Sequence, residues 1–160
     1  MTGPSVQTIV GATSVSDASL RKFAGYQMKR SFNVLQVDLL KRLKPFGLRM
    51  VTFSTLTLIV DNPGLSQSQL AEAMAMESPN FVGIVDELHR KGLIVRDRAT
   101  DDRRAYALCA TDVGAKVLAQ AFAAVQAHED QLLGALTLNE REALVAMLRK
   151  VETGPKGKTT

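Results

Sequence analysis

The sequence predicts a mainly α-helical fold with a small β wing, and two observations lead to this prediction. Residues 66–91 carry two short helical patterns separated by a tight turn, and residues 93–110 carry two strand patterns around a charged tip. Two short helices followed by a hairpin is the order of a winged helix-turn-helix. Longer helical patterns lie on both sides, so we predict that this unit is flanked by long N- and C-terminal dimerisation helices.

The segment before this unit predicts two helices. Residues 1–15 mix Gly, Pro, Ser and Thr without periodicity, which is typical of a flexible N-terminal arm. From residue 17 to residue 43 apolar residues recur at helical spacing until a proline and a glycine end the pattern, and we assign residues 16–47 to an N-terminal dimerisation helix. Residues 50–60 are almost entirely apolar and predict a helix that is buried on most sides.

The two short helices lie within the region 48–111, which we expect to bind DNA. Ser66 and Gln69 have the spacing of a capping box, which predicts the start of the first helix. Pro79 suits the first turn of the second helix, where a missing N–H costs nothing, and Ser78 is the expected cap. An apolar stripe at helical spacing follows until Gly92, which predicts a recognition helix at about 78–91.

The wing is predicted at about 93–110, and further helices follow it. From residue 90 to residue 104 six basic residues stand against three acids, so the hairpin carries the net positive charge that suits a phosphate backbone. A long helix is predicted at 112–136, and Thr137 with Glu140 predicts the capping box of a terminal helix. We assign residues 112–152 to C-terminal dimerisation helices and residues 153–160 to a flexible tail.

Composition limits the classes of protein that need to be considered. The 160 residues, 46% of them hydrophobic, are enough for one domain with a real core. The net charge of +4 is too small to indicate a nucleic-acid partner without the clustering in the wing. The single cysteine provides no disulfide framework, and we find neither a signal peptide pattern nor an apolar run long enough for a bilayer. We therefore expect a cytoplasmic protein with no membrane partner.

A resemblance to a known family rests on the wing. The run GLIVRDRATDDRRAYALCATDVG resembles the signature of the MarR family of transcription regulators, in which Asp-x-Arg at the wing tip is followed by Thr-x-x-Gly. Asp102, Arg104, Thr111 and Gly114 occupy those positions. LSQSQLAEAMAMESPNFVGIVDELHRKGLIVR resembles the family's helix-turn-helix, and LTLNEREALVAMLRKV resembles its final helix, so the resemblance covers most of residues 20–151.

The resemblance implies a homodimeric, sequence-specific regulator of transcription. Such a dimer places two recognition helices in successive major grooves and binds a pseudo-palindromic double-stranded DNA site with half-sites about one helical turn apart. Family habit further implies a repressor that is released by a small organic ligand, such as an aromatic acid.

Candidate DNA-binding residues lie in both short helices and in the wing. The amide of Asn80 can pair with adenine N6 and N7, whereas Ser78 and Pro79 have helix initiation as an equally good explanation. The resemblance implies that Arg104 enters the minor groove, with Asp102 orienting it or a neighbouring arginine. A solvated hairpin with weak surface ion pairs is the alternative for the wing. The full predicted set is Ser66, Ser68, Ser78, Pro79, Asn80, Val82, Gly83, Arg96, Arg98, Asp102, Arg103 and Arg104.

Two positions of the recognition helix are ambiguous. Gly83 stands where several relatives carry a long basic or polar side chain, so it indicates either a close approach of the backbone to DNA or packing against a neighbouring element. Phe81 and Val82 lie in the helical stripe, which favours a place in the core over a contact with DNA.

An effector site is implied in the crevice between the dimer helices and the winged unit. Its candidate residues are Phe23, Tyr26, Arg49, Met50 and Phe53. Arg49 stands next to an apolar segment, where relatives place a capping threonine, and could hold a ligand carboxylate. The alternative is a surface arginine near a helix start.

Other functions compete with this interpretation, and each would depend on particular residues. A winged helix that serves as a protein–protein interaction module usually lacks the basic tip that Arg103 and Arg104 provide here. A cysteine redox-sensing regulator would depend on Cys109, whose strand position favours a small buried apolar group. His89 and His128 lack a cluster of further ligands, so we expect no metal site and no cofactor. We find no nucleophile with a base, no paired carboxylates and no phosphate loop, and therefore expect no enzyme.

Overall fold

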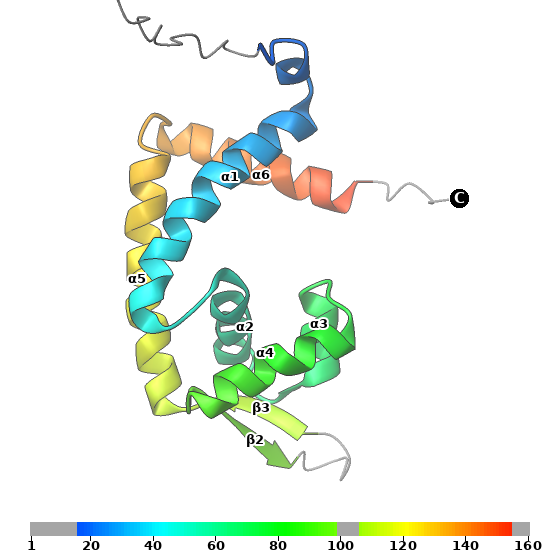
Figure 1. Ribbon diagram of the computed structural model, residues 1–160, viewed down its shortest axis with the longest axis vertical. Helices are drawn as coiled ribbons and strands as arrows, with labels where there is room; N and C mark the ends of the chain where they lie inside the picture. The colour runs from blue at the N-terminus through cyan, green and yellow to red at the C-terminus, as the bar shows by residue number, and fades with distance from the viewer. Residues whose placement is uncertain (1–15, 99–105, 155–160) are drawn as a thin grey trace, which may run out of the picture. The chain divides into compact units, whose positions relative to one another are not determined.

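The computed structural model describes residues 16–98 and 106–154, and the chain divides into two compact units inside its first long helix, after Val34. The elements in chain order are η1 (Leu20–Lys22), α1 (Ala24–Leu43), η2 (Lys44–Phe46), α2 (Met50–Asp61), β1 (Leu65–Ser66), α3 (Gln67–Ala73), α4 (Ser78–Arg90), β2 (Ile94–Arg98), β3 (Tyr106–Ala110), α5 (Asp112–Leu132) and α6 (Leu138–Thr153) (Figure 1).

The prediction of one continuous helix from residue 17 to residue 43 is wrong. A 3-10 turn at η1 comes first, and Phe23 then takes an extended backbone (φ −94°, ψ 124°) before α1 begins. The side chain of Gln27 donates to the carbonyl of Arg21 at 3.0 Å and so compensates for a bond that the break removes from the helical series. Gly25, a weak helix former, follows directly after the break.

The helix-turn-helix consists of α3 and α4. The predicted capping box of α3 is confirmed, because Gln69 N–H donates to Ser66 Oγ and the Gln69 side chain accepts from Ser66 N–H. The predicted cap of α4 is wrong by one residue. Glu77 is the cap, since its carbonyl already accepts the first helical bond, from Phe81 N–H, and Ser78 is the first helical residue.

The wing is part of a three-stranded antiparallel sheet in the order β1-β3-β2. The predicted hairpin is confirmed, with Ile94 opposite Ala110 and Arg98 opposite Tyr106. Strand β1 was not predicted. It has only two residues, Leu65 and Ser66, which pair with Leu108 and Ala107 and are too few to show an alternating pattern.

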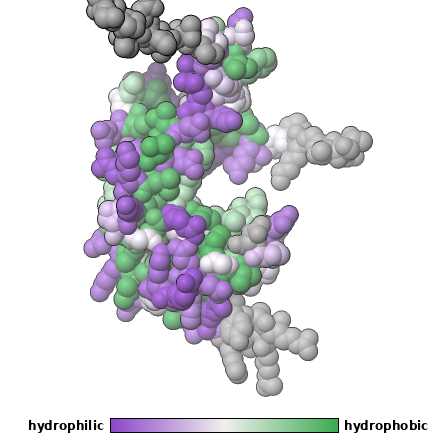
Figure 2. All heavy atoms as spheres, viewed as in Figure 1, coloured by the Kyte–Doolittle hydropathy of each residue, from purple (hydrophilic) through white to green (hydrophobic). Residues whose placement is uncertain are grey.

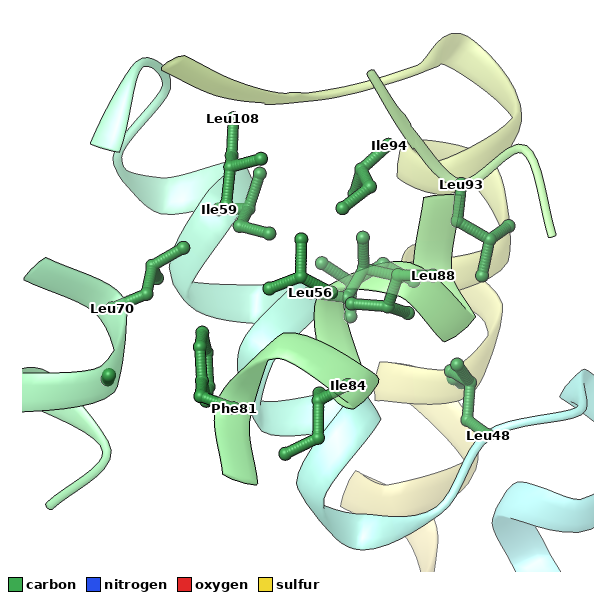
Figure 3. Close-up of a cluster of buried hydrophobic side chains, with 14 of the residues drawn as sticks. Leu48, Leu56, Ile59, Leu70, Phe81, Ile84, Leu88, Leu93, Ile94 and Leu108 are labelled. Atoms are coloured by element: carbon green, nitrogen blue, oxygen red, sulfur yellow. The ribbon is translucent and has the colours of Figure 1, made fainter. Parts of the chain in front are cut away.

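The core lies inside the winged unit. Side chains of α2, α3, α4 and the sheet converge there, and Leu56, Ile59, Leu70, Phe81 and Leu108 are completely buried (Figure 3). The apolar run of α2 is buried in this core, as predicted. Burial of residues from so many elements fixes α4 relative to the sheet.

The family signature residues Thr111 and Gly114 join the wing to α5. Thr111 Oγ1 accepts from Gly114 N–H at 2.9 Å and donates to Gly92 O at 2.7 Å, while Thr111 N–H donates to Leu93 O at 3.0 Å. A Cβ on Gly114 would lie 1.9 Å from Leu93 O. The start of α5 therefore contacts the turn between α4 and β2 so closely that a side chain at residue 114 has no room.

The long C-terminal helices differ from the prediction only in one boundary. α5 ends at Leu132 rather than at residue 136. Leu133 N–H still donates to Glu129 O, but Gly134 N–H donates to Gln131 O, three residues back, as in a terminating turn. The capping box of Thr137 and Glu140 at the start of α6 is confirmed.

No single helix in the described ranges is long and apolar enough to cross a membrane. The segments Ala24–Phe46 and Met50–Asp61 satisfy that criterion only when they are taken together as a bent pair.

Candidate nucleic-acid interface

The recognition helix α4 has one buried face and one exposed face. Phe81 and Val85 are completely buried, so the prediction that Phe81 belongs to the core is confirmed. Val82 is 42% exposed, and the prediction of a core position for it is wrong, because the stripe that packs on α2 and α3 passes through residues 81, 84, 85 and 88 instead. Pro79 and Gly83 are exposed together with Val82.

Gly83 does not serve close packing within the chain. A Cβ at this position would meet nothing within 4 Å, so the alternative in which glycine lets the helix pack on a neighbour is wrong. The exposed face of α4 is therefore flat at residue 83 and open to an approaching partner.

Arg96 connects the wing to the recognition helix. Its guanidinium forms an ion pair and hydrogen bond with Asp86 of α4, although its Nε atom is buried without a partner among the described residues. An arginine held by the protein in this way is poorly placed to reach DNA itself, and it fixes the angle between β2 and α4 instead.

Six of the predicted contact residues lie wholly or with their side chains outside the described part of the chain. Asp102, Arg103 and Arg104 lie outside the described residues, and for Ser78, Asn80 and Arg98 only the backbone is described. Ser66 uses its hydroxyl in the cap of α3, where it also lies 3.0 Å from the hydroxyl of the exposed Ser68.

A second ion network engages α4 at the residue next to Asp86. Glu87 accepts hydrogen bonds from Lys91 Nζ at 2.7 Å and from the guanidinium of Arg49, and Lys91 also donates to Gly47 O. The hydrogen bond from Lys91, together with that from Arg49, holds the pKa of Glu87 below its ordinary value of 4.5, against the opposing effect of burial. Sequence reasoning missed this network because its partners are distant in the chain. Arg49 and Glu87 are 38 residues apart, and Lys91 and Gly47 are 44 residues apart.

Glu87→Gln should reduce the stability of the winged unit in a manner that depends on pH. A carboxyl whose pKa is lowered on folding stabilises the folded state above its unfolded pKa, and this contribution disappears as the pH falls below about 4.5. Urea unfolding should therefore show a loss of no more than about 1 kcal/mol at neutral pH, and a smaller one at acid pH. The exposed Glu72→Gln of α3 is the control. An equal loss at both pH values would contradict the ionic role.

The predicted effector residues fall into both units. Phe23 is 65% exposed, and Tyr26 donates from its hydroxyl to Asp17 Oδ2 at 2.9 Å, both in the first unit. In the second unit Phe53 packs against Phe122 of α5, with ring centroids 6.3 Å apart, and Met50 is half-buried at the start of α2. Arg49 is the N-cap residue of α2 and is 59% exposed on its side chain, but its guanidinium is paired with Glu87.

The cysteine and the two histidines lie in three different elements. Cys109 is half-buried in β3 opposite Val95, in agreement with a place in the sheet. Within the described part of the chain no three His, Cys, Asp or Glu side chains are grouped as a metal site would require. His128 is almost fully buried and contacts Asp38 Oδ2 through Nδ1 at 3.0 Å, whereas His89 is exposed.

Comparisons with known proteins agree with this geometry. The model of the MarR family matches residues 48–106. The solved structure of the transcriptional repressor CouR bound to a 23-mer DNA duplex superimposes with a TM-score of 0.83 at 35% sequence identity, over 88% of this chain and 99% of that chain. This chain belongs to the MarR family. The MarR resemblance of the wing signature is thereby confirmed, as is the winged helix-turn-helix fold.

Two further matches cover different lengths of the chain. CouR bound to p-coumaroyl-CoA has a TM-score of 0.78 at 33% identity and covers 88% of this chain and 99% of that chain. A protein of Thauera aromatica, named as a transcriptional regulatory protein for the hcr operon, is 39% identical over 99 residues. That match spans 62% of this chain and 60% of the length of the relative. MarR regulators are DNA-binding proteins without enzymatic activity, in agreement with the prediction of no enzyme.

Proposed function

We propose that this MarR protein is a sequence-specific, double-stranded DNA-binding repressor of transcription that works in the cytoplasm. The observation that carries the proposal is the recognition helix, whose C-terminal half is held by ion pairs at Asp86 and Glu87 and which turns an open face outward beside a basic hairpin. A rigid helix with a free face is what entry into the major groove requires. The similarity to CouR, solved in complex with a DNA duplex, supports the same mode of binding.

We further propose that the protein acts as a homodimer. α6 exposes large apolar side chains that the described chain leaves uncovered, and Phe122 of α5 is exposed as well. Figure 2 shows green, hydrophobic residues at the surface among purple ones. The exposed side chains on α6 are Leu138, Val145, Met147, Leu148 and Val151. A second copy would bury them together with Phe122 and would present two recognition helices to a pseudo-palindromic site.

The test of the function is selection of bound duplexes from a randomised DNA pool, followed by titration of the selected duplex at several salt concentrations. We expect an enriched palindrome with half-sites about one helical turn apart and a steep loss of affinity with salt. A pool that shows no enrichment would overturn the proposal and would favour a protein–protein interaction module.

For regulation, we propose release by a ligand with an aromatic group and an anionic group, because CouR has been solved with p-coumaroyl-CoA. An anion near Arg49 would compete with Glu87 for the guanidinium and so loosen one support of α4. Met50 and Phe53, which lie in the same compact unit as Arg49, are the proposed apolar and aromatic contacts.

Arg49→Ala should remove part of the thermal stabilisation that p-coumaroyl-CoA gives to the protein. The thermal shifts with p-coumarate and with free coenzyme A are measured separately. Glu72→Ala, an exposed substitution on α3, should leave the stabilisation intact. An unchanged shift in the Arg49 variant would exclude Arg49 from the site.

A further inference from the structure

The centre of the exposed face of α4 is apolar. Residues 79, 82, 83 and 86 follow each other at the spacing that places side chains on one side of a helix. Val82 is 42% exposed there, although its neighbour Phe81 is completely buried. An aliphatic side chain that the protein does not cover is available for contact with a partner.

Two of the described positions beside Val82 offer no polar side chain to a partner. Pro79 has no N–H, and Gly83 has no side chain and open space above it. Asp86 is paired with Arg96 of the wing through Oδ1, and its side chain is 47% exposed. The isopropyl group of Val82 is therefore the apolar group that projects between these positions.

Only one base carries an apolar group on its major-groove edge. Guanine, cytosine and adenine present hydrogen-bond donors and acceptors there, whereas thymine adds a C5-methyl group. A polar edge placed against Val82 would lose its water without gaining a partner, and a thymine methyl would gain apolar contact.

We propose that Val82 reads the C5-methyl group of one thymine in each operator half-site. This inference rests on the proposed function, since it requires that α4 enters the major groove. It assigns a base preference to a side chain with no hydrogen-bonding group. Gly83 assists, because the absence of a side chain lets the helix come close enough for the two methyl-bearing groups to touch.

The experiment is a methyl-deletion scan of the selected operator. Each thymine is replaced in turn, in both half-sites, by deoxyuridine, which lacks only the C5-methyl group. Affinity of the full-length protein is measured for every duplex, and the scan is repeated with Val82→Ala. Val113→Ala is the matched control, because it removes the same atoms from an exposed valine of α5.

At one thymine per half-site we expect deoxyuridine to weaken wild-type binding about four-fold, or about fifteen-fold when both half-sites are changed, as for a buried methyl group. Val82→Ala should abolish this penalty at that thymine alone, and the control should retain it. The exposed position of Val82 predicts that Val82→Ala folds normally, which circular dichroism can verify.

The outcomes separate this inference from the function on which it rests. If wild type selects an operator but no deoxyuridine weakens binding, or if the penalty is the same in Val82→Ala, the methyl contact is wrong and the repressor function stands. If wild type selects no operator at all, the proposed function itself fails.

Discussion

Gly114→Ala should destabilise the protein by about 3 kcal/mol or more. The added Cβ would lie 1.9 Å from the carbonyl oxygen of Leu93 and 2.8 Å from its carbonyl carbon. Because both atoms are backbone, no side-chain rotation can relieve the clash, and either the start of α5 or the end of α4 must move. The move would also break the hydrogen bonds of Thr111, which join the same two segments.

Urea unfolding monitored by circular dichroism measures this effect, and Gly83→Ala is the matched control. Both variants add one methyl group to a helical glycine, but the Cβ at residue 83 meets nothing within 4 Å. Alanine is the better helix former by about 0.5–1 kcal/mol, so the control should be slightly more stable than wild type. A similar change in both variants would show that the contact between α5 and Leu93 is not a constraint.

Arg104→Ala should weaken binding to every duplex and make binding less dependent on salt. The MarR signature places this arginine at the wing tip, outside the described residues, and the pairing of β2 with β3 leads the chain toward that tip. Each lost phosphate contact lowers the slope of log affinity against log salt by about 0.9, so a dimer with two wings should lose about 2.

Titration of the selected operator and of a random duplex over a range of salt provides the measurement. Arg149→Ala on α6 removes the same charge away from the wing and should leave the slope unchanged.

Asn80→Ala should instead relax the preference at one base position per half-site, where about 1–3 kcal/mol of discrimination is lost. Equal losses, independent of salt, in the Arg104 and Asn80 variants would contradict both roles.

Much of the fold was predictable because its signals are local. The capping boxes at Ser66 and Thr137, the helix stop at Gly92 and the alternating strands of the hairpin each depend on residues within one or two turns of chain. The boundary errors at Phe23 and Leu132 arose where a helical pattern of apolar residues continued past the last hydrogen-bonded turn. Periodicity records which face is apolar but does not record where the hydrogen-bond series stops.

The candidate site was predictable only in part. The sequence identified α4 and the wing as the elements that meet DNA, but it favoured a core position for Val82 while also counting this residue among the candidate contacts. Residues 81 and 82 are both apolar, and periodicity could not decide which of two adjacent residues faces α2. The pairs of Arg96 with Asp86 and of Arg49 with Glu87 changed the interpretation of two predicted site arginines.

By itself the sequence determined the family, the order of helices and strands, and the basic character of the wing. Helix capping, periodicity and the signature Asp-x-Arg with Thr-x-x-Gly all depend on residues that are close together in the chain. Only the tertiary structure decided which face of α4 is free, which arginines are already paired, and why residue 114 must be glycine. These properties depend on contacts between elements that are distant in the chain. Their distances are set by packing of the whole core and not by any local preference.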